Sequence, residues 1–554
     1  MASLEPKAAG RSGTSRAVQL LLVLGLLAAP LPAPSPAGAQ WTGISVPTSP
    51  LPLRTSPGEL EDATEPARPG LGGGLWQLGG NPAALGIRSN LDVSPPNGGT
   101  SGGARTAITR VSGDRRLVQE ASERTLVSAM MYGGQENSTL HSTGIFRYRR
   151  VADREVRWSA TAFPHAGTPY VWTDSTGGDW ERDLVEVHGA GGTAPGVLPS
   201  DLLVGASISA RFGQGARRND PRPLFRIRDL RFSPGVALSG ERWTVGLAPI
   251  LAWHREEGEI GYFAGDDPFV FRIRGYGTFD RTQLVRGVRT REGRTMGAGV
   301  QLRRESDREQ LVVAGQLTAG SDSIRQGIAR PEFAGGHDRV EGRMAILLTR
   351  QGQDAALRTI RAMGRHEQGR GTDPVFRALN TRDLRTSVSV EAGTRHPSEG
   401  GRAPGSAALL DWTLELGVSR DEREDIAADT RWSVTSARAG VRVGADVPLP
   451  ALGVVRLTLA PAVTRRLADD WHAGRPTRMT EELVRPDYLV FRQGSRDLAA
   501  GVVWHRVRPS GGVLQLDLEV STSRGQGAVA ASSPLPVDPA SHRTALQLSV
   551  SLLQ

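Results

Sequence analysis

The second half of the chain alternates between apolar and polar positions in stretches of ten to fourteen residues. In the stretch 513–521, Leu and Val occupy every second position, and Gln, Asp, Glu and Ser separate them. Successive side chains of a strand point to opposite faces, so each stretch predicts a strand with one apolar and one polar face. The stretches after residue 293 are 294–303, 309–319, 338–349, 355–365, 384–395, 408–419, 432–443, 453–466, 497–507, 513–523 and 543–553.

The connections between these stretches alternate between shorter and longer, which is typical of transmembrane barrels with tight turns inside and loops outside. The stretches approach the ~9–11 residues of a tilted spanning strand, whereas soluble strands average ~5–6. We predict an all-β fold, a transmembrane antiparallel up-and-down β-barrel of about 16–20 strands, seven or eight of them before residue 293. The shorter connections are 304–308, 350–354, 396–407, 444–452 and 508–512; the longer ones are 320–337, 366–383, 420–431, 467–496 and 524–541.

The N-terminal part predicts export. Residues 1–39 combine a basic start, an apolar run at 18–29 and a small-x-small site ending at Ala39, the pattern of a secretory signal peptide. A membrane anchor is the alternative, but a spanning helix needs ~17 residues or more. Residues 40–75 are rich in Pro and Gly and predict a flexible linker. The barrel is assigned to 104–554, and we expect it in the cell outer membrane.

The composition excludes several classes of site. The chain has no cysteine, which excludes disulfides, cysteine-bound metals and a lipoprotein anchor. Lys7 is the only lysine, so removal of residues 1–39 leaves 67 − 3 = 64 cations, all arginine, against 58 − 1 = 57 acidic residues. These arginines alternate with Asp and Glu instead of forming one basic stripe, so we expect no nucleic-acid partner.

Charged residues within the predicted strands are the candidates for a pore or its rim. Inward-facing arginines would favour anions in a pore, and arginines at the rim would pair with lipid phosphates. The sequence leaves the face of Arg361 undetermined. The candidate pore or rim charges are Arg303, Arg358, Arg442, Arg456, Glu415, Asp517 and Glu519.

A short segment before the first strand resembles a known family. Residues 81–86 read Asn-Pro-Ala-Ala-Leu-Gly, which is similar to the Asn-Pro-Ala-x-Leu segment of long-chain fatty-acid-transporter-like barrels. That resemblance implies an N-terminal hatch in the lumen, so 76–103 is expected to form a plug. An Asn-Pro turn before a strand is the alternative. The residues of the expected plug are Asn81, Pro82, Ala83 and Leu85.

The region 75–554 as a whole resembles a family of uncharacterised Gram-negative outer-membrane barrel proteins. The similarity comprises the Trp76…Asn81 opening, a loop that reads Thr-Pro-Tyr at 168–170 and Asp-Leu-Val-Glu at 183–186, and the strand-rich body. It implies the fold and the outer-membrane location, and it carries no activity.

Catalytic and metal motifs are weak. The Gly-x-Ser-x-Gly match at 99–103 lies in a Gly/Pro tract without the strand and helix of a nucleophile elbow. The acidic turns 265–268 and 421–425 could hold calcium, or they are solvated loops. A lipid hydrolase would need Ser521 or Ser549 beside a histidine of a neighbouring strand.

We therefore expect a pore or transporter for small solutes, with no cofactor and no reaction chemistry. Its expected partners are outer-membrane lipid, lipopolysaccharide and a small solute. The alternative is a surface scaffold or secretion-associated barrel that binds a protein partner through the extracellular loops 164–201 and 467–496. An outer-membrane lipid hydrolase is the third hypothesis.

Overall fold

The structure is a computed structural model. All the residues that it describes belong to the unit 41–554. The predicted signal peptide 1–39 and linker 40–75 lie outside the described residues. The described residues are 83, 100–161, 168–262, 269–283, 286–352, 356–395, 409–449, 452–507, 512–526 and 541–553.

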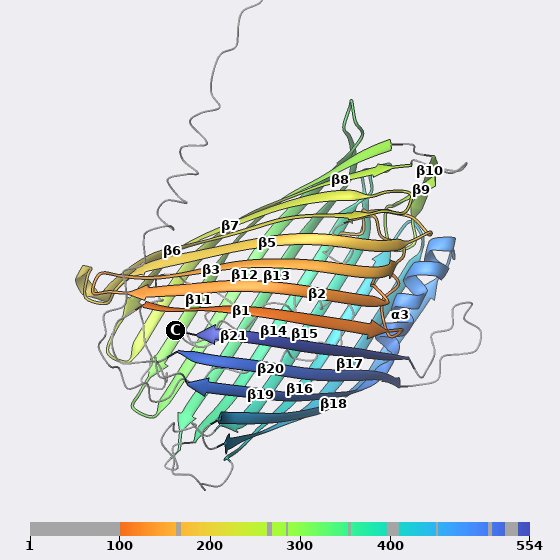
Figure 1. Ribbon diagram of the computed structural model, residues 1–554. Helices are drawn as coiled ribbons and strands as arrows, with labels where there is room; N and C mark the ends of the chain where they lie inside the picture. Colours follow the sequence, from red (N-terminus) through yellow and green to blue (C-terminus); the bar gives the residue numbers. More distant parts are fainter. Residues whose placement is uncertain are drawn as a thin grey trace, which may run out of the picture. The chain divides into compact units, whose positions relative to one another are not determined.

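Eighteen antiparallel strands form one sheet that closes on itself, because β1 pairs with both β2 and β21 (Figure 1). The prediction of a closed barrel with 16–20 strands is confirmed. The strands are β1 Thr100–Gly113, β2 Glu123–Glu136, β3 Leu140–Val156, β5 Gly178–Thr193, β6 Leu202–Arg217, β7 Leu224–Ser239, β8 Trp243–Gly261, β11 Arg286–Glu305, β12 Glu309–Gln326, β13 Glu332–Gln351, β14 Leu357–Thr372, β15 Leu379–Arg395, β16 Leu409–Asp425, β17 Thr430–Leu449, β18 Gly453–Ala473, β19 Gly494–Val507, β20 Val513–Gln526 and β21 His542–Leu553.

Many strands are longer than their alternation predicts. β18, for example, has 21 residues, although the pattern ends at residue 466. The extra length lies at one end of the barrel, so the expected long loops 320–337, 366–383 and 420–431 are wrong. These connections are the short turns 327–331, 373–378 and 426–429. The predicted loops 164–201 and 467–496 likewise contain strand residues: β5 occupies 178–193, including 183–186, and β18 continues to residue 473.

Apolar side chains cover the outer face of the barrel in a belt. On β16, Leu410, Trp412, Leu414, Leu416 and Val418 are each about 40–55% exposed, and the residues between them face the lumen. The belt is about nine residues tall, close to the length of a spanning strand. Hydrocarbon tails are the solvent that such a face requires, because water would leave this whole area unburied.

Among the described residues, no helix is both long and apolar enough to cross a bilayer.

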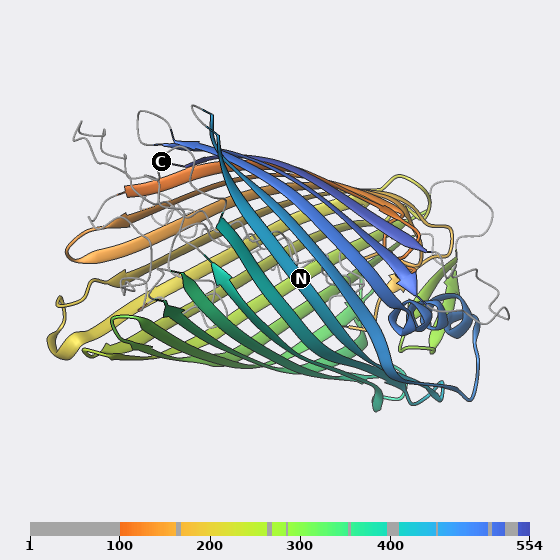
Figure 2. The same cartoon turned by 90° about the horizontal axis from the view of Figure 1, so that it is seen from below.

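The two ends of the barrel differ. The turn end carries short connections such as 137–139, 240–242 and 306–308. The other end carries 114–122, 157–177, 262–285 and 474–493, whose described parts we call the cap (Figure 2). The cap contains the three-stranded sheet β10-β9-β4 and a helical segment. Its elements are β4 Trp172–Thr173, β9 Phe269–Ile273, β10 Phe279–Gln283, η4 Thr480–Val484 and α3 Arg485–Arg492; η3 Pro199–Asp201 lies at the turn end.

Candidate functional site

The cap has an apolar core of its own. Its three long connections contribute Trp158 and Val171, Phe271 and Ile273, and Met479 and Leu483, all buried in one cluster. Backbone hydrogen bonds join the connections, such as Ile273 N to Val171 O at 2.9 Å. The connections therefore pack as one small folded unit.

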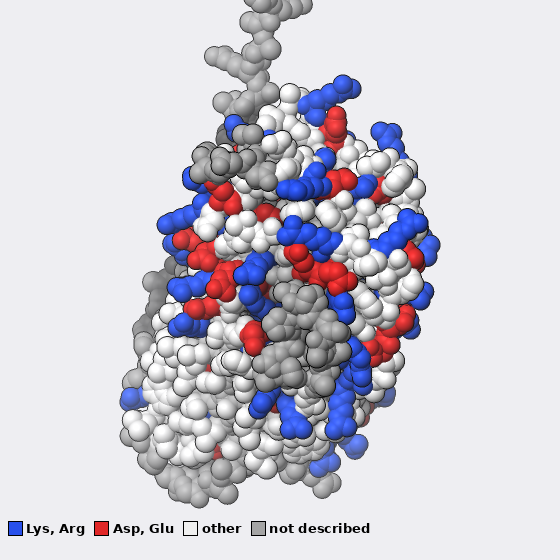
Figure 3. Space-filling view, turned by 90° about the vertical axis from the view of Figure 1, so that its right-hand side faces the viewer, with Lys and Arg blue, Asp and Glu red and all other residues white. Residues whose placement is uncertain are grey.

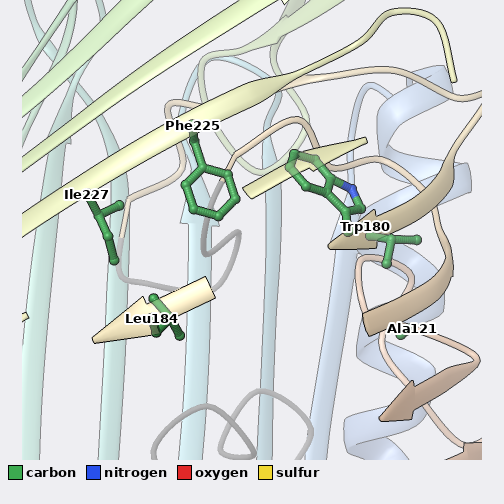
Figure 4. Close-up of a cluster of buried hydrophobic side chains, with 6 residues drawn as sticks. Ala121, Trp180, Leu184, Phe225 and Ile227 are labelled. Atoms are coloured by element: carbon green, nitrogen blue, oxygen red, sulfur yellow. The ribbon is translucent and has the colours of Figure 1, made fainter. Parts of the chain in front are cut away.

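Apolar side chains of the barrel wall also pack at this end. Trp432 and Val434 on β17 contact Val484, Tyr488 and Leu489 of the helical segment. A second wall cluster, shown in Figure 4, joins Trp180, Leu184, Phe225 and Ile227 to Ala121 and Val156. Burial of these side chains holds the cap against the inner wall.

Asp425, at the end of β16, fastens the cap to the wall. Its buried carboxylate accepts hydrogen bonds from the backbone N–H and hydroxyl of Thr278, at 2.8 and 2.9 Å, and from Ala428 N–H at 3.0 Å. Arg274, in the same cap connection, pairs with Asp373 at 3.1 Å. Every bond in this group joins a fully or largely buried donor to a carboxylate, so we call it the clasp.

Two wall glycines form a socket for Tyr170 of the cap. Gly335 has φ +136°, and a Cβ there would lie 2.6 Å from the Tyr170 ring. At Gly371, a Cβ would lie 2.7 Å from the Tyr170 hydroxyl. In addition, the Arg289 guanidinium of β11 donates a hydrogen bond to the backbone carbonyl of Tyr170. Any larger side chain at these glycines would displace the cap.

The contacts of the cap reach strands around the whole circumference. Arg217 at the end of β6 pairs with Asp174 at 2.7 Å, and both side chains are almost fully buried. Trp172 donates to Gln326 of β12, and Tyr488 donates to Asp469 of β18 at 2.6 Å. Together with the clasp and the socket, these contacts place the cap across the mouth of the lumen. Charged residues of both signs are intermixed over this end (Figure 3).

Asp487 is a buried acid within the cap. Its carboxylate accepts a hydrogen bond from Val118 N–H at 2.8 Å, across two cap connections. Burial raises the pKa of Asp487 to about 7, although this hydrogen bond and Arg423 favour the charged form. Asp487 is therefore largely protonated at mildly acidic pH, and a buried charge appears above neutrality.

This pKa makes the packing of the cap depend on pH. Between the ordinary value near 4 and about 7, the folded form holds a proton that the unfolded form has lost. The stability of the cap therefore falls as pH rises through this window. We expect amide hydrogen exchange in 474–493, corrected for its intrinsic pH dependence, to lose about tenfold or more of its protection between pH 5 and pH 8. In Asp487→Asn the protection should stay constant; equal pH dependence in both proteins would refute the assignment.

Below the cap, the inner wall carries a lattice of paired charges. Arg438 pairs with Asp497 at 2.6 Å and with Glu415 at 3.4 Å, and Arg343 pairs with Glu341 at 2.7 Å. The side chains of Arg343 and Glu415 are 37% and 34% exposed. The lumen is thus polar and solvated at this level, with its positive charges largely balanced by carboxylates.

The strand register places each predicted charge. Arg303 pairs with Glu305 at 2.5 Å near the turn end, Arg456 pairs with Asp411 and Asp446, and Asp517 meets Arg105 at 3.5 Å. Six of the seven candidates face the lumen, and one faces outward. Inward are Arg303, Arg442 opposite Thr413, Arg456, Glu415, Asp517 and Glu519 opposite Gln547; outward is Arg358, opposite Arg350 and on the same face as exposed Ile360.

The register also settles Arg361, whose face the sequence leaves open. It lies opposite Glu391 on the inner face of the wall.

Of the four residues of the expected plug, the structure describes Ala83. Ala83 is fully buried and clusters with Leu203 and Ala237, a cross-strand pair on the inner wall near the turn end. Asn81, Pro82 and Leu85 lie outside the described residues. Residues 100–103 begin β1, so the expected boundary at 103 is wrong and the wall starts at Thr100.

Among the described residues, the candidate hydrolase serine Ser549 is hydrogen-bonded to a carboxylate and to an arginine. Ser549 donates to Asp517 at 2.7 Å and accepts from Arg105 at 3.0 Å. Residues 421–425 lie in β16 and not in a loop, so that expectation is wrong, and the turn 265–268 lies outside the described residues. Among the residues that the structure describes, no group of three His, Cys, Asp or Glu could hold a metal ion.

Sequence reasoning missed the cap, although the chain holds a signal for it. On β7 the apolar residues Leu230 and Phe232 face lipid, whereas Phe225 and Ile227 face inward. The alternation therefore changes phase along one strand. Such a change is expected where one part of a strand contacts lipid on its outer face and the next part contacts the apolar core of the cap on its inner face.

Comparison with solved structures finds outer-membrane barrels of several kinds. They include the ferric yersiniabactin uptake receptor FyuA from Yersinia pestis (10% identity, 83% of this chain and 81% of that chain, TM-score 0.35). The copper transporter OprC matches with 10% identity over 83% and 84% of the two chains, at TM-score 0.37. OccK11 (OpdR) from Pseudomonas aeruginosa matches with 10% identity over 82% and 96%, at TM-score 0.30.

No curated protein matches the sequence significantly. The model of one protein family, however, matches residues 99–553, which is the complete barrel with its cap. The chain belongs to the family of unknown function DUF6850.

Proposed function

We propose that the barrel lies in the bacterial outer membrane, with the turn end toward the periplasm and the cap outside. Barrels of this membrane have short periplasmic turns and longer external connections, and both end strands of the wall, β1 and β21, have their outer termini at the turn end. The predicted signal peptide supplies the export route. Outward arginines at the turn end, such as Arg358, would then contact the phosphates of lipids in the periplasmic leaflet, and outward arginines at the cap end would contact those of the outer leaflet, including lipopolysaccharide.

We further propose that the barrel moves a small polar solute, and that the cap gates its outer mouth. The observation that carries this proposal is the contrast between two levels of the lumen. At the cap, Arg217 and Asp174 are almost fully buried, whereas Arg343 and Glu415 in the middle of the wall are about one third exposed. A solvated, charged chamber beneath a separately folded lid suits controlled passage better than a permanently open pore.

Because the arginines of the chamber are paired with carboxylates, the solute would meet both charges. A zwitterionic or hydrogen-bonding solute fits this lattice better than a simple anion. The segment 76–103 would act at the opposite end, where Ala83 is buried against the inner wall.

Conductance in a planar bilayer tests the proposal. Wild-type protein should show brief, low-conductance openings, and removal of residues 76–99 should raise the conductance of those openings. The shortened protein keeps β1 intact, and its folding is checked by a heat-dependent shift on an unboiled gel. If neither protein conducts ions at any voltage, transport through the lumen is refuted.

The alternative of a protein-binding scaffold rests on free loops at 164–201 and 467–496. Residues 168–177 of the first loop and 474–493 of the second contribute to the cap, where Trp172 and Leu489 are buried. A partner would have to displace this core, so transport is the function we favour. For a lipid hydrolase, loss of activity in a Ser549→Ala variant would be the deciding result.

A further inference from the structure

We propose that three arginines on the outer wall, Arg465, Arg496 and Arg524, form a binding site for the phosphate group of a membrane glycolipid in the outer leaflet. The inference rests on the proposed placement in the outer membrane and is independent of solute transport. The three residues lie on the adjacent strands β18, β19 and β20 (Figure 1).

The strand register brings the three side chains together. Arg496 and Arg524 are directly opposite each other. Arg465 lies beside Gly494, since a Cβ added at Gly494 would be 3.5 Å from the Arg465 Cα, so Arg465 is a diagonal neighbour of Arg496. Opposed residues have Cβ atoms ~5 Å apart and diagonal ones ~7 Å. Three guanidinium groups can therefore reach one phosphate group or two neighbouring ones.

Their height on the barrel matches a lipid headgroup. On the same outer face, Val463 and Leu498 lie directly below Arg465 and Arg496, and Val520 lies below Arg524 beyond Thr522; all three are exposed members of the apolar belt. The arginines therefore lie at the level where the hydrocarbon ends. At that level, Arg side chains place their stems on apolar surface and their charge in the polar region.

Within the described part of the chain, no carboxylate balances the cluster. Among the residues that the structure describes, Arg465, Arg496 and Arg524 have no ion pair and no side-chain hydrogen bond, and all three are exposed. Like charges directly opposite each other on a sheet are destabilising unless an anion lies between them. A phosphate would supply that anion, and arginine binds it through paired N–H donors.

Three other outward arginines at this end of the barrel are balanced within the protein. Arg420 pairs with Glu422 at 2.8 Å, Arg382 with Glu424 at 3.4 Å, and Arg431 with Asp470 at 3.4 Å. The three-arginine cluster is thus distinguished from these pairs by its local charge and not by its residue type alone. This contrast also supplies a matched control.

The test measures binding of lipid A, which carries two phosphates, to the full-length protein in neutral detergent at low salt. An arginine near a membrane surface contributes about 1 kcal/mol toward anionic lipid, or roughly fivefold in affinity. The variant R465Q/R496Q/R524Q should therefore bind on the order of 100-fold more weakly. Dephosphorylated lipid A should bind wild type as weakly as it binds the variant, and inorganic phosphate at millimolar concentration should not displace the intact lipid.

The control variant R382Q/R420Q/R431Q removes the same net charge from arginines that are already paired. It should retain wild-type affinity within about threefold, and both variants should keep the heat-dependent gel shift of a closed barrel. Equal binding of lipid A by wild type and R465Q/R496Q/R524Q would overturn the site. An equal loss in both variants would also overturn it, since net charge alone would then explain binding. Displacement by inorganic phosphate would assign the cluster to a free anion instead of a lipid.

Discussion

Replacing Asp425 by alanine is expected to increase the ion conductance of the barrel strongly. Asp425 accepts hydrogen bonds from Thr278 N–H, from the Thr278 hydroxyl and from Ala428 N–H, and it is completely buried. Its loss would leave these donors buried without partners, at about 1–3 kcal/mol each. If docking of the cap loses about 3 kcal/mol, the undocked population rises on the order of 100-fold. Single-channel recording in a planar bilayer would measure this as a higher open probability.

A matched control lies on the same strand. Glu422 is on the outer face of β16, where it pairs with Arg420 at 2.8 Å. Glu422→Ala removes one carboxylate near the same level of the barrel without touching the cap, and it should conduct like wild type. If Asp425→Ala forms an intact barrel but its open probability is no higher than that of wild type, the cap does not control the mouth of the lumen, whatever the lumen transports.

The apolar belt could be predicted from the sequence because the two faces of each strand meet different solvents. Within the membrane, one face of each strand meets hydrocarbon and the other meets a polar lumen, so apolar and polar residues must alternate. Leu414 and Leu416 face outward and Glu415 faces inward, as the pattern predicts. Each of the eleven stretches after residue 293 is accordingly a strand of the barrel.

Beyond the belt, apolar residues no longer have to face outward, and the predicted strand ends are wrong there. The cap-end half of β17 faces water outside and the cap inside, so Trp432 and Val434 are buried inward while belt residue Val441 is exposed outward. At the cap end the apolar residues move from the outward-facing to the inward-facing positions of the strand. The regular alternation is interrupted there, and the predicted strand ends at the interruption. For that reason the sequence pattern predicts loops where the strands in fact continue.

The cap itself depends on contacts between distant parts of the chain. Thr278 and Asp425 are 147 positions apart, and Val118 and Asp487 are 369 apart. No local pattern specifies such pairs. The pairing of lumenal charges, such as Arg456 with Asp411 and Asp446, likewise follows from the register. The sequence could name the charged residues, but it could not show that they balance one another.

An arginine placed on the outer face of the belt is expected to destabilise the barrel by about 2–4 kcal/mol, the cost of that side chain near the middle of a bilayer. Val388 on β15 suits this test because it is 54% exposed and lies opposite Val418, another belt residue. In Val388→Arg the guanidinium would have to stay in hydrocarbon or bend toward the headgroups. Reversible unfolding by guanidinium chloride in phospholipid vesicles would measure the loss.

The next residue along the strand provides the control, because it points the other way. Ser389 faces the lumen opposite Gly417, which presents no side chain to it, and other charged residues of the lumen, such as Glu415, are solvated. Ser389→Arg should therefore change the free energy of unfolding by less than about 1 kcal/mol. The difference between two adjacent positions isolates the solvent on each face from every other property of arginine. If both substitutions cost the same, the outer face of the barrel is not immersed in lipid, and the membrane placement is wrong.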